Sequence, residues 1–409
     1  MTDRILLTNA RVLTCTADEA PFDGDILIEG DKIAQVTHGR LETAARVVDL
    51  KGATVLPGLG DAHTHISWPL DFVFDHAGVA SAPEGKHLLD VAAVTRTYLE
   101  SGYTLLIGAG VTQPNDDLYA QHAIDNGLIP GPRIIPSGAM IADARGLGAD
   151  GGMMEVAADA DELRAIVRRQ CESGVRSLKL FISGDGVIPE YPSQDVYMND
   201  EMLTAAVHEA DSRGAFITTH ARGSLSVAMA ARTGVRIIHH ACFLDDDAVN
   251  ELCKRAEDVW VCPGLHYLYA MVSGHAKPWG ITDEQIDASG YRREFDSQIE
   301  GLHTLRQAGV NIVAGGDFGH QWTRHGSYAA ELQRYVELVG MTPTEAIRTA
   351  TRNAGQAAAL ATGQIRAGYL ADLMITDGDP TRDITVLQDK PRAVIKDGRF
   401  AYLNPGLYP

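Results

Sequence analysis

The most informative residues near the start of the chain are two histidines in the run LPGLGDAHTHI. His63 and His65 are two positions apart, so on an extended strand both side chains point to the same face. Two imidazoles presented in this way are suited to bind one metal ion. Such a pair also arises by chance, so a metal site requires further ligands elsewhere in the chain.

Further candidate ligands stand at the ends of other apolar runs. His220 closes FITTHARG, His239 and His240 close RIIHHACF, and Asp317 closes IVAGGDFG. Each alone has an ordinary alternative, such as a hydrogen-bonded core histidine or a loop aspartate. Adjacent residues of a strand face opposite ways, so we expect at most one of His239 and His240 to enter a site.

Lys179 is the one charged residue in the apolar run SLKLF. Burial near metal ions would favour the neutral amine, which can react with carbon dioxide to form a carbamate. This two-oxygen anion can bridge two metal ions about 3.5–4 Å apart. Alternatively, the ammonium group extends to solvent or pairs with Asp185. Spacing alone leaves both interpretations open.

The distribution of apolar and polar residues along the sequence indicates which secondary-structure elements position these residues. Short apolar runs alternate with amphipathic helices from residue 56 to residue 358, whereas both ends of the chain consist of short β-rich runs. We therefore predict an α/β fold, with a metal-binding (β/α)8 TIM barrel over 56–360 and a small composite β-sandwich domain formed by 1–55 and 361–409. Carboxyl-terminal strand ends in such a barrel build one site, which would unite the candidate ligands.

The barrel elements are predicted from the periodicity of apolar residues and from the glycines that end the helices. Strands are expected over 102–110, 132–138, 177–184, 215–221, 236–241, 259–264 and 311–317. Helices are expected over 161–174, 199–214, 247–257, 297–309 and 341–360. The last of these begins with a capping box, Thr342 and Glu345, and has Pro343 in its first turn.

Composition narrows the class of protein. The 409 residues carry a formal net charge of -19, which argues against nucleic acid or an anionic membrane as the main partner. The sequence contains no signal peptide and no apolar run long enough for a membrane span. Its five scattered cysteines lack a CxxC pair and are expected to be reduced thiols. We expect a soluble, cytoplasmic protein.

Taken in order, the motifs resemble those of the amidohydrolase superfamily over essentially the whole chain. The matching runs are PGLGDAHTHI, GPRIIPSG, SLKLFISG, HARG, HHACFLDDD, AGGDFG and GQIRAGYLADLMITDGDP. The resemblance is strongest to the imidazolonepropionase-like and Xaa-Pro dipeptidase-like branch with a carboxylated lysine. Relatives in this branch act on N-acyl amino acids, ochratoxin or phenylureas.

The resemblance implies a binuclear centre of two divalent ions, with zinc the expected metal. His63, His65 and Asp317 would bind the more buried ion, and a carboxylated Lys179 would bridge to the second. The ligands of the second ion would be His220 and His240. The branch commonly has Glu where this chain has His239, so we assign the ligand to His240 and place His239 on the other face of the strand.

The implied activity is hydrolysis of a C–N bond through a metal-bridging hydroxide. Asp317 would ligate metal, take the proton of the water and pass it to the leaving nitrogen. The substrate would be a small amide, N-acyl amino acid, carbamate or urea. Alternatives are a dipeptidase, a cyclic-amide hydrolase or a lactonase. A mononuclear deaminase is less favoured, because no HxxE motif follows His220. A non-catalytic binding subunit is also less favoured, because such a protein would be expected to have lost ligand residues, whereas every ligand position is filled here.

Substrate contacts are expected from the loops after strands 1, 7 and 8. The candidates for orienting the substrate are His266, Tyr267, His320, His325 and Trp68. Phe72 and Phe74 would extend an apolar or aromatic pocket around Trp68, which favours an aryl or apolar substrate. The predicted partner is therefore a small molecule, and relatives suggest a homo-oligomer.

Overall fold

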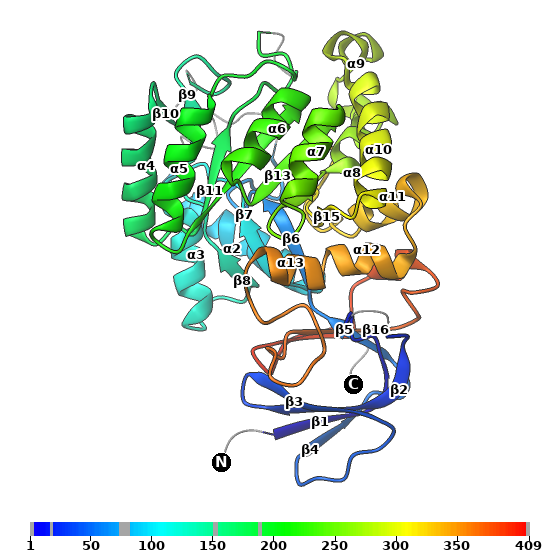
Figure 1. The fold of residues 1–409 in the computed structure, drawn as a ribbon. Helices are drawn as coiled ribbons and strands as arrows, with labels where there is room; N and C mark the ends of the chain where they lie inside the picture. The colour runs from blue at the N-terminus through cyan, green and yellow to red at the C-terminus, as the bar shows by residue number, and fades with distance from the viewer. Residues whose placement is uncertain (1–3, 17–18, 73–81, 150–153, 187–189, 406–409) are drawn as a thin grey trace.

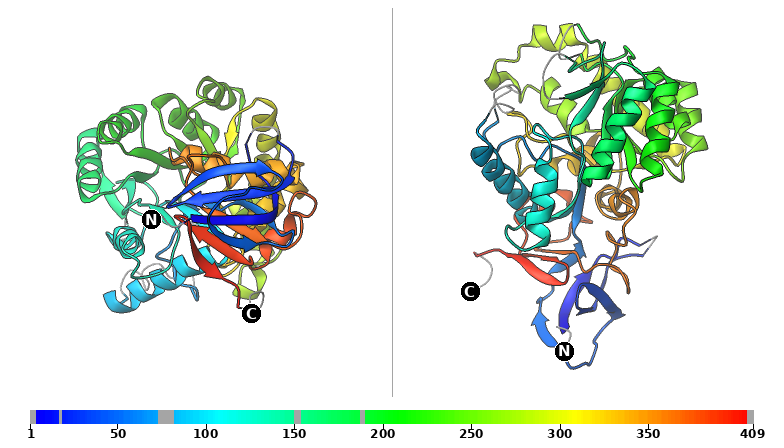
Figure 2. Two further views of the ribbon diagram at one scale, coloured as in Figure 1. Left: turned by 90° about the horizontal axis from the view of Figure 1, so that it is seen from below. Right: turned by 90° about the vertical axis from the view of Figure 1, so that its left-hand side faces the viewer.

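The computed structural model describes residues 4–16, 19–72, 82–149, 154–186 and 190–405. A parallel β/α barrel lies above a β-rich layer in Figure 1, and the two remain distinct in the views of Figure 2. The predicted fold class, a TIM barrel with a small β domain, is confirmed. Within the described residues no helix has the length and apolarity to cross a bilayer.

The β-rich layer is one eight-stranded sheet that joins both ends of the chain, in the order β18-β17-β16-β5-β1-β2-β3 with β4 paired to β1. Its strands are β1 (Arg4–Val12), β2 (Phe22–Glu29), β3 (Lys32–His38), β4 (Arg46–Asp49), β5 (Thr54–Pro57), β16 (Leu373–Thr376), β17 (Ala393–Lys396) and β18 (Arg399–Leu403). β5 pairs with β16 in antiparallel register. The sheet thus draws on both segments predicted to form it, while the boundaries of the two domains stay a prediction.

The barrel strands match the predicted runs closely. They are β6 (Leu59–Thr64), β7 (Tyr103–Gly108), β8 (Arg133–Ile135), β11 (Ser177–Phe181), β12 (Phe216–Gly223), β13 (Ile237–Phe243), β14 (Trp260–Cys262) and β15 (Asn311–Ile312). Two further strands, β9 (Met140–Asp143) and β10 (Met154–Ala157), extend the sheet beside β11. Hydrogen bonds close the barrel where Ala62 N donates to Ala314 O at 2.9 Å and Arg176 N to Pro136 O at 2.9 Å.

Helices surround the barrel. They are α2 (Glu84–Glu100), α3 (Asp116–Asp125), α4 (Ala160–Ser173), α5 (Asp200–Asp211), α6 (Ser224–Thr233), α7 (Asp246–Lys254), α8 (Leu265–Val272), α9 (Asp283–Ser289), α10 (Tyr291–Gln307), α11 (Ala330–Val339), α12 (Pro343–Thr349) and α13 (Arg352–Ala357). Short 3₁₀ turns cover η1 (Lys277–Trp279) and η2 (Ile384–Gln388).

Two expectations about helices were wrong. The segment after strand 7 was expected to be a loop, but it contains α8, and this helix carries His266 and Tyr267. The helix expected over 341–360 has the predicted capping box but breaks between α12 and α13. The reason is local, because the carbonyl of Ala350 accepts the N–H of Gly60 in β6 instead of continuing the helical ladder.

Candidate active site

The ends of the barrel strands bring the six predicted ligands into one buried cluster. His63 lies in β6, Lys179 in β11, His220 in β12 and His240 in β13, while His65 follows β6 directly. Asp317 follows β15 and has a positive φ of 55°, which turns the chain sharply at this point. The predicted strand ends therefore do converge in space.

Contacts connect the cluster from one side to the other. His63 Nε2 lies 3.3 Å from Lys179 Nζ, and His65 Nε2 lies 3.3 Å from Asp317 Oδ1. The rings of His220 and His240 are 4.5 Å apart between centroids, and those of His63 and His240 are 5.2 Å apart. With the 3.6 Å contact between His63 Nε2 and Asp317 Oδ1, these contacts link all six side chains into one cluster.

Hydrogen bonds to backbone carbonyls fix which ring nitrogens face the cluster. His65 Nδ1 lies 3.1 Å from Gly110 O, and His220 Nε2 lies 3.1 Å from Gly184 O. Because a carbonyl only accepts, His65 Nδ1 carries the hydrogen in the neutral ring, which leaves a lone pair on His65 Nε2, whereas His220 Nε2 also lies in the path of the Arg222 Nε–H at 3.3 Å. The lone pair of His65 then faces the carboxylate of Asp317, an arrangement that a cation between them would stabilise.

Other polar atoms in the cluster are also without partners. Within the part of the chain that the structure describes, the buried atoms His240 Nε2 and His63 Nδ1 have no hydrogen bond. Buried polar atoms are normally paired, so an unpaired set of ligand-type atoms indicates a site for a bound group. Donor atoms of His63, His240 and Asp317 all lie within 4.8 Å of one another, as ligands of one metal ion require.

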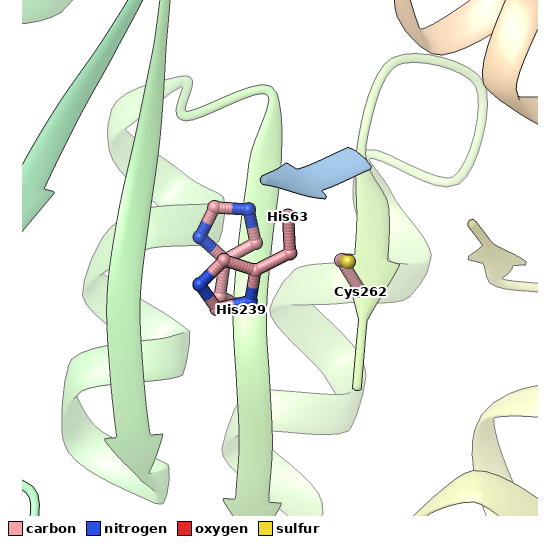
Figure 3. A group of neighbouring side chains, drawn as sticks. All are labelled: His63, His239 and Cys262. Carbon is pink, nitrogen blue, oxygen red and sulfur yellow. The ribbon is translucent and has the colours of Figure 1, made fainter. Parts of the chain in front are cut away.

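A second group with metal-ligand spacing consists of His63, His239 and Cys262, shown in Figure 3. This group was not predicted, because Cys262 carried no motif signal. Both nitrogens of His239 are already engaged, with Lys179 Nζ and Ala62 O. Burial also raises the pKa of the Cys262 thiol well above its ordinary value, which disfavours the thiolate that binds metal. The group with His240 and Asp317 is the better candidate.

The expected placement of His239 on the opposite face of its strand was wrong. His239 and His240 both face the interior, and the ring of His239 stacks on that of His63 at 4.0 Å and 14°. Strand alternation fails here because His240 and Ala241 have φ values of 75° and 50°. Sequence reasoning had no signal for this backbone distortion.

Lys179 is fully buried in the cluster. Burial lowers the pKa of its amine to about 7, so a large share of the molecules hold it uncharged at neutral pH. Its Nζ contacts two imidazole nitrogens, at 2.5 Å in His239 and 3.3 Å in His63. The alternative in which Lys179 reaches solvent is thereby excluded, and its contacts do not include the predicted alternative partner Asp185.

The pKa values of two buried carboxyl groups at the cluster are shifted in opposite directions. Burial acts to raise the pKa of Asp317, but the neighbouring His65, His320 and Lys179 more than compensate and hold that pKa below its ordinary value. Asp61, behind His63, accepts the His63 backbone N–H at 2.9 Å, and its burial raises its pKa to about 8. Asp317 is therefore the ionised carboxylate of the cluster.

A buried arginine beside the cluster was missed, although it stands within the motif HARG. Arg222 Nε lies 3.3 Å from His220 Nε2, and its NH2 group donates to Asp185 Oδ2 at 2.8 Å and its NH1 group to Glu294 Oε1. Tyr291 donates its hydroxyl hydrogen to Asp185 at 2.9 Å. Burial, together with the Arg222 charge, lowers the pKa of His220 to about 3, which keeps its imidazole neutral.

Three of the predicted substrate contacts lie against the cluster. Trp68 stacks on His65 at 4.1 Å, and His320 meets the edge of Trp68 at 4.6 Å and of Tyr267 at 5.0 Å. Phe72 stacks on Trp68 at 5.3 Å. These rings form an aromatic wall beside His65, whereas Phe74 lies outside the described residues.

The other two predicted contacts occupy different places. His325 uses both nitrogens within the protein, at 3.1 Å from Tyr328 Oη and 3.0 Å from Trp68 O, so it supports the loop that carries Trp68. The ring of His266 packs near Phe318 and Tyr269. Neither arrangement indicates a direct contact with substrate.

Comparison with known proteins settles the family. The family model described as "Amidohydrolase family" matches residues 54–401. The chain belongs to the amidohydrolase family. The superfamily resemblance read from the motifs is therefore confirmed, and the protein is a hydrolase by family.

Individual amidohydrolases match nearly the whole chain. Ochratoxinase of Aspergillus niger is 27% identical over 97% of this chain and 86% of its own length. Imidazolonepropionase of Vibrio vulnificus is 25% identical over 97% of both chains. A crystal structure of a prolidase complexed with N-methylphosphonate-L-proline is 25% identical, with a TM-score of 0.86 over 97% of this chain and 99% of that one. These similarities confirm the imidazolonepropionase-like and Xaa-Pro dipeptidase-like branch, while the carboxylated lysine stays a prediction.

Proposed function

We propose that this amidohydrolase uses two divalent metal ions to hydrolyse a C–N bond in a small apolar or aryl substrate. The observation that carries the proposal is the set of ring nitrogens and carboxylate oxygens that converge without other partners, above all His65 Nε2 facing Asp317 Oδ1. The predicted ligand set would hold the ions: His63, His65, Lys179 as N6-carboxylysine, His220, His240 and Asp317. Zinc suits this mixture of imidazole and oxygen ligands.

Bound ions would lower the pKa of a coordinated water toward neutrality and polarise the substrate carbonyl. The chain supplies the proton transfers. Asp317 is ionised, so it can accept the proton of the attacking water on a carboxylate oxygen and later donate it to the leaving nitrogen. His320 Nδ1, 3.2 Å from the Asp317 backbone carbonyl, steadies the turn that carries this carboxylate.

The lone pair of His65 Nε2 is held in place by the hydrogen bond from His65 Nδ1 to Gly110 O. Such backbone partners fix the tautomer and orientation of metal-binding imidazoles. Lys179 is buried with a pKa of about 7, which supplies the neutral amine that carboxylation needs. These features support a preorganised site rather than a collection of core histidines.

The aromatic wall of Trp68, Phe72, Tyr267 and His320 supports an aryl or apolar substrate. Flat rings favour stacking and edge contacts with a second ring, worth about 0.5–1.5 kcal/mol each beyond area burial. One relative is an ochratoxinase. We therefore rank amides and N-acyl amino acids with aromatic groups first, followed by aryl carbamates and ureas.

A dipeptidase is the second candidate, because a prolidase structure matches nearly the full chain. Such an enzyme needs a cation for the substrate carboxylate. Arg222 is the cation beside the cluster, but Asp185 and Glu294 already neutralise it. This pairing places the dipeptidase below the aryl amidase.

The test measures metal content per chain in protein purified without chelator, for the native chain and Lys179→Ala. We expect about two ions per native chain and one or none in the variant, because the bridging ligand is lost. Lys86→Ala, which removes an exposed lysine paired with Asp90, is the matched control and should leave the metal content unchanged. A panel of N-acyl aromatic amino acids, phenylureas, carbamates and Xaa-Pro dipeptides then ranks the substrates.

A native metal content of one ion that Lys179→Ala does not change would contradict the binuclear proposal. In that case the mononuclear deaminase would become the better hypothesis. Hydrolysis of lactones but of no amide or carbamate in the panel would retain the metal site and overturn the C–N bond assignment.

A further inference from the structure

His239, the histidine expected to face away from the site, contacts the lysine at its centre. Its Nδ1 lies 2.5 Å from Lys179 Nζ, and its Nε2 lies 3.1 Å from Ala62 O. The side chain is fully buried, and its ring is fixed by stacking on His63. We propose that His239 is a positioning residue that accepts the single N–H of carboxylated Lys179 and thereby sets the orientation of the carbamate. This inference rests on the proposed function, which requires the modified lysine.

The hydrogen-bond directions follow from the contacts. The carbonyl of Ala62 only accepts, so Nε2 of His239 carries the ring hydrogen. A fully buried imidazole beside an amine is neutral and has one ring hydrogen, so Nδ1 is an acceptor. His239 therefore presents a fixed lone pair to Nζ, and its own orientation is anchored to the strand of His63 through Ala62.

This environment fits a carbamate better than an ammonium group. An ammonium group has three donors and no acceptor, whereas Nζ has two hydrogen bonds, both to ring nitrogens and neither to a carboxylate, among the residues that the structure describes. A carbamate nitrogen has one hydrogen, and one acceptor satisfies it. His239 Nδ1 is the nearer acceptor, at 2.5 Å against 3.3 Å for His63 Nε2.

Carboxylation is balanced with carbon dioxide as the only co-reactant. The lone pair of neutral Nζ attacks the carbon, a C–N bond forms, and one C=O electron pair moves to oxygen. The nitrogen then loses one of its two hydrogens as a proton to solvent, and the product is R–NH–COO⁻. Because the carbamate nitrogen is planar, holding its N–H on His239 directs the carboxylate group away from His239.

The test uses ¹³C-labelled bicarbonate and observes the carbamate carbon of the intact protein by NMR, together with metal content. Lys179→Ala identifies the signal. His239→Asn keeps an acceptor oxygen near the position of Nδ1, and His239→Leu has a similar size without an acceptor. We expect the Asn variant to retain the signal and the Leu variant to need at least about tenfold more bicarbonate for half occupancy, as loss of one buried hydrogen bond predicts.

His239→Phe, which keeps the stacked ring but has no nitrogen, provides a second variant without the acceptor if His239→Leu does not fold. A purely structural role predicts that Phe is tolerated better than Asn, and this order would overturn the inference. Equal bicarbonate dependence in the native chain and all His239 variants would also overturn it, while the native signal would still support the proposed function. A native chain without any carbamate signal would contradict the modified lysine itself, and the inference with it.

Discussion

Removal of the Arg222 guanidinium is expected to destabilise the barrel strongly. The side chain is fully buried and lies between the carboxylates of Asp185 and Glu294. Arg222→Leu fills a similar space but leaves the buried carboxylate of Glu294 and the partly buried carboxylate of Asp185 without their cation. Breaking a buried pair in this way costs about 3–5 kcal/mol, because the remaining charge stays desolvated.

Arg232→Leu is the matched control. Arg232 also binds a carboxylate through two nitrogens, with Asp200 at 2.7 Å for each contact, but on the surface. An exposed pair of this kind contributes about 1 kcal/mol or less. The difference in the free energy of unfolding between the two variants therefore measures how much more a buried arginine–carboxylate contact contributes than an exposed one.

Urea titration followed by tryptophan fluorescence is a suitable assay. All four tryptophans lie between residues 68 and 322, so the signal reports on the barrel. Chelator is present throughout, because loss of bound metal would otherwise add to the difference in the free energy of unfolding. If the two variants differ by less than about 1 kcal/mol, Arg222 does not stabilise the barrel by charge pairing, and the reasoning fails.

The pH dependence gives an independent check. Burial acts to raise the pKa of Asp185, but the Arg222 charge holds it below its ordinary value. In the native chain this group therefore stabilises the fold above about pH 3.9 and loses its effect as the pH falls through the folded-state pKa. In Arg222→Leu only His220 and the Tyr291 hydrogen bond still oppose burial, so the pKa of Asp185 is higher than in the native chain and less stability is gained as the pH rises. The difference in the free energy of unfolding between the native chain and Arg222→Leu should therefore widen from pH 5 to pH 8.

Two further predictions concern Glu331 and Trp68. Burial raises the pKa of Glu331 to about 7; its contribution to stability is thus present below about pH 4.5 and lost as the pH rises through 7, by about 3 kcal/mol. Glu331→Gln should flatten this part of the urea-midpoint profile, and an unchanged slope would contradict the assignment. Trp68→Ala should raise KM for an aryl amide roughly tenfold, by loss of ring contacts, but change KM for an acetyl analogue less. An equal change for both substrates would argue against an aromatic wall.

The architecture was predictable because the barrel repeats one strong pattern. Runs such as SLKLFISG and RIIHHACF are short, apolar and bounded by helices that end in glycine, which indicates buried parallel strands. Candidate ligands stood at the ends of these runs, and the geometry of a barrel brings strand ends together. Their convergence followed from the fold, without any knowledge of side-chain contacts.

The details that escaped prediction depend on individual backbone angles and on contacts between distant segments. We placed His239 outside the site, but it lies level with His220 in the sheet and faces inward, and the left-handed conformations of His240 and Ala241 let His240 face inward as well. The helix over 341–360 broke because Ala350 O bonds to Gly60 N, almost 300 residues away in sequence. Neither helix or strand propensities nor the periodicity of apolar residues can predict such backbone angles or a hydrogen bond between distant segments.

The pairing of β5 with β16 has a consequence for synthesis of the chain. β5 emerges from the ribosome about 300 residues before the strand that completes its side of the sheet. At typical elongation rates this delay is roughly 15–60 s. Throughout that interval one edge of β5 has open backbone donors and acceptors, the feature that favours association between nascent chains. The last β-strands therefore protect the first ones, and a polypeptide that stops within the barrel would release an N-terminal half-sheet able to pair with another copy of itself.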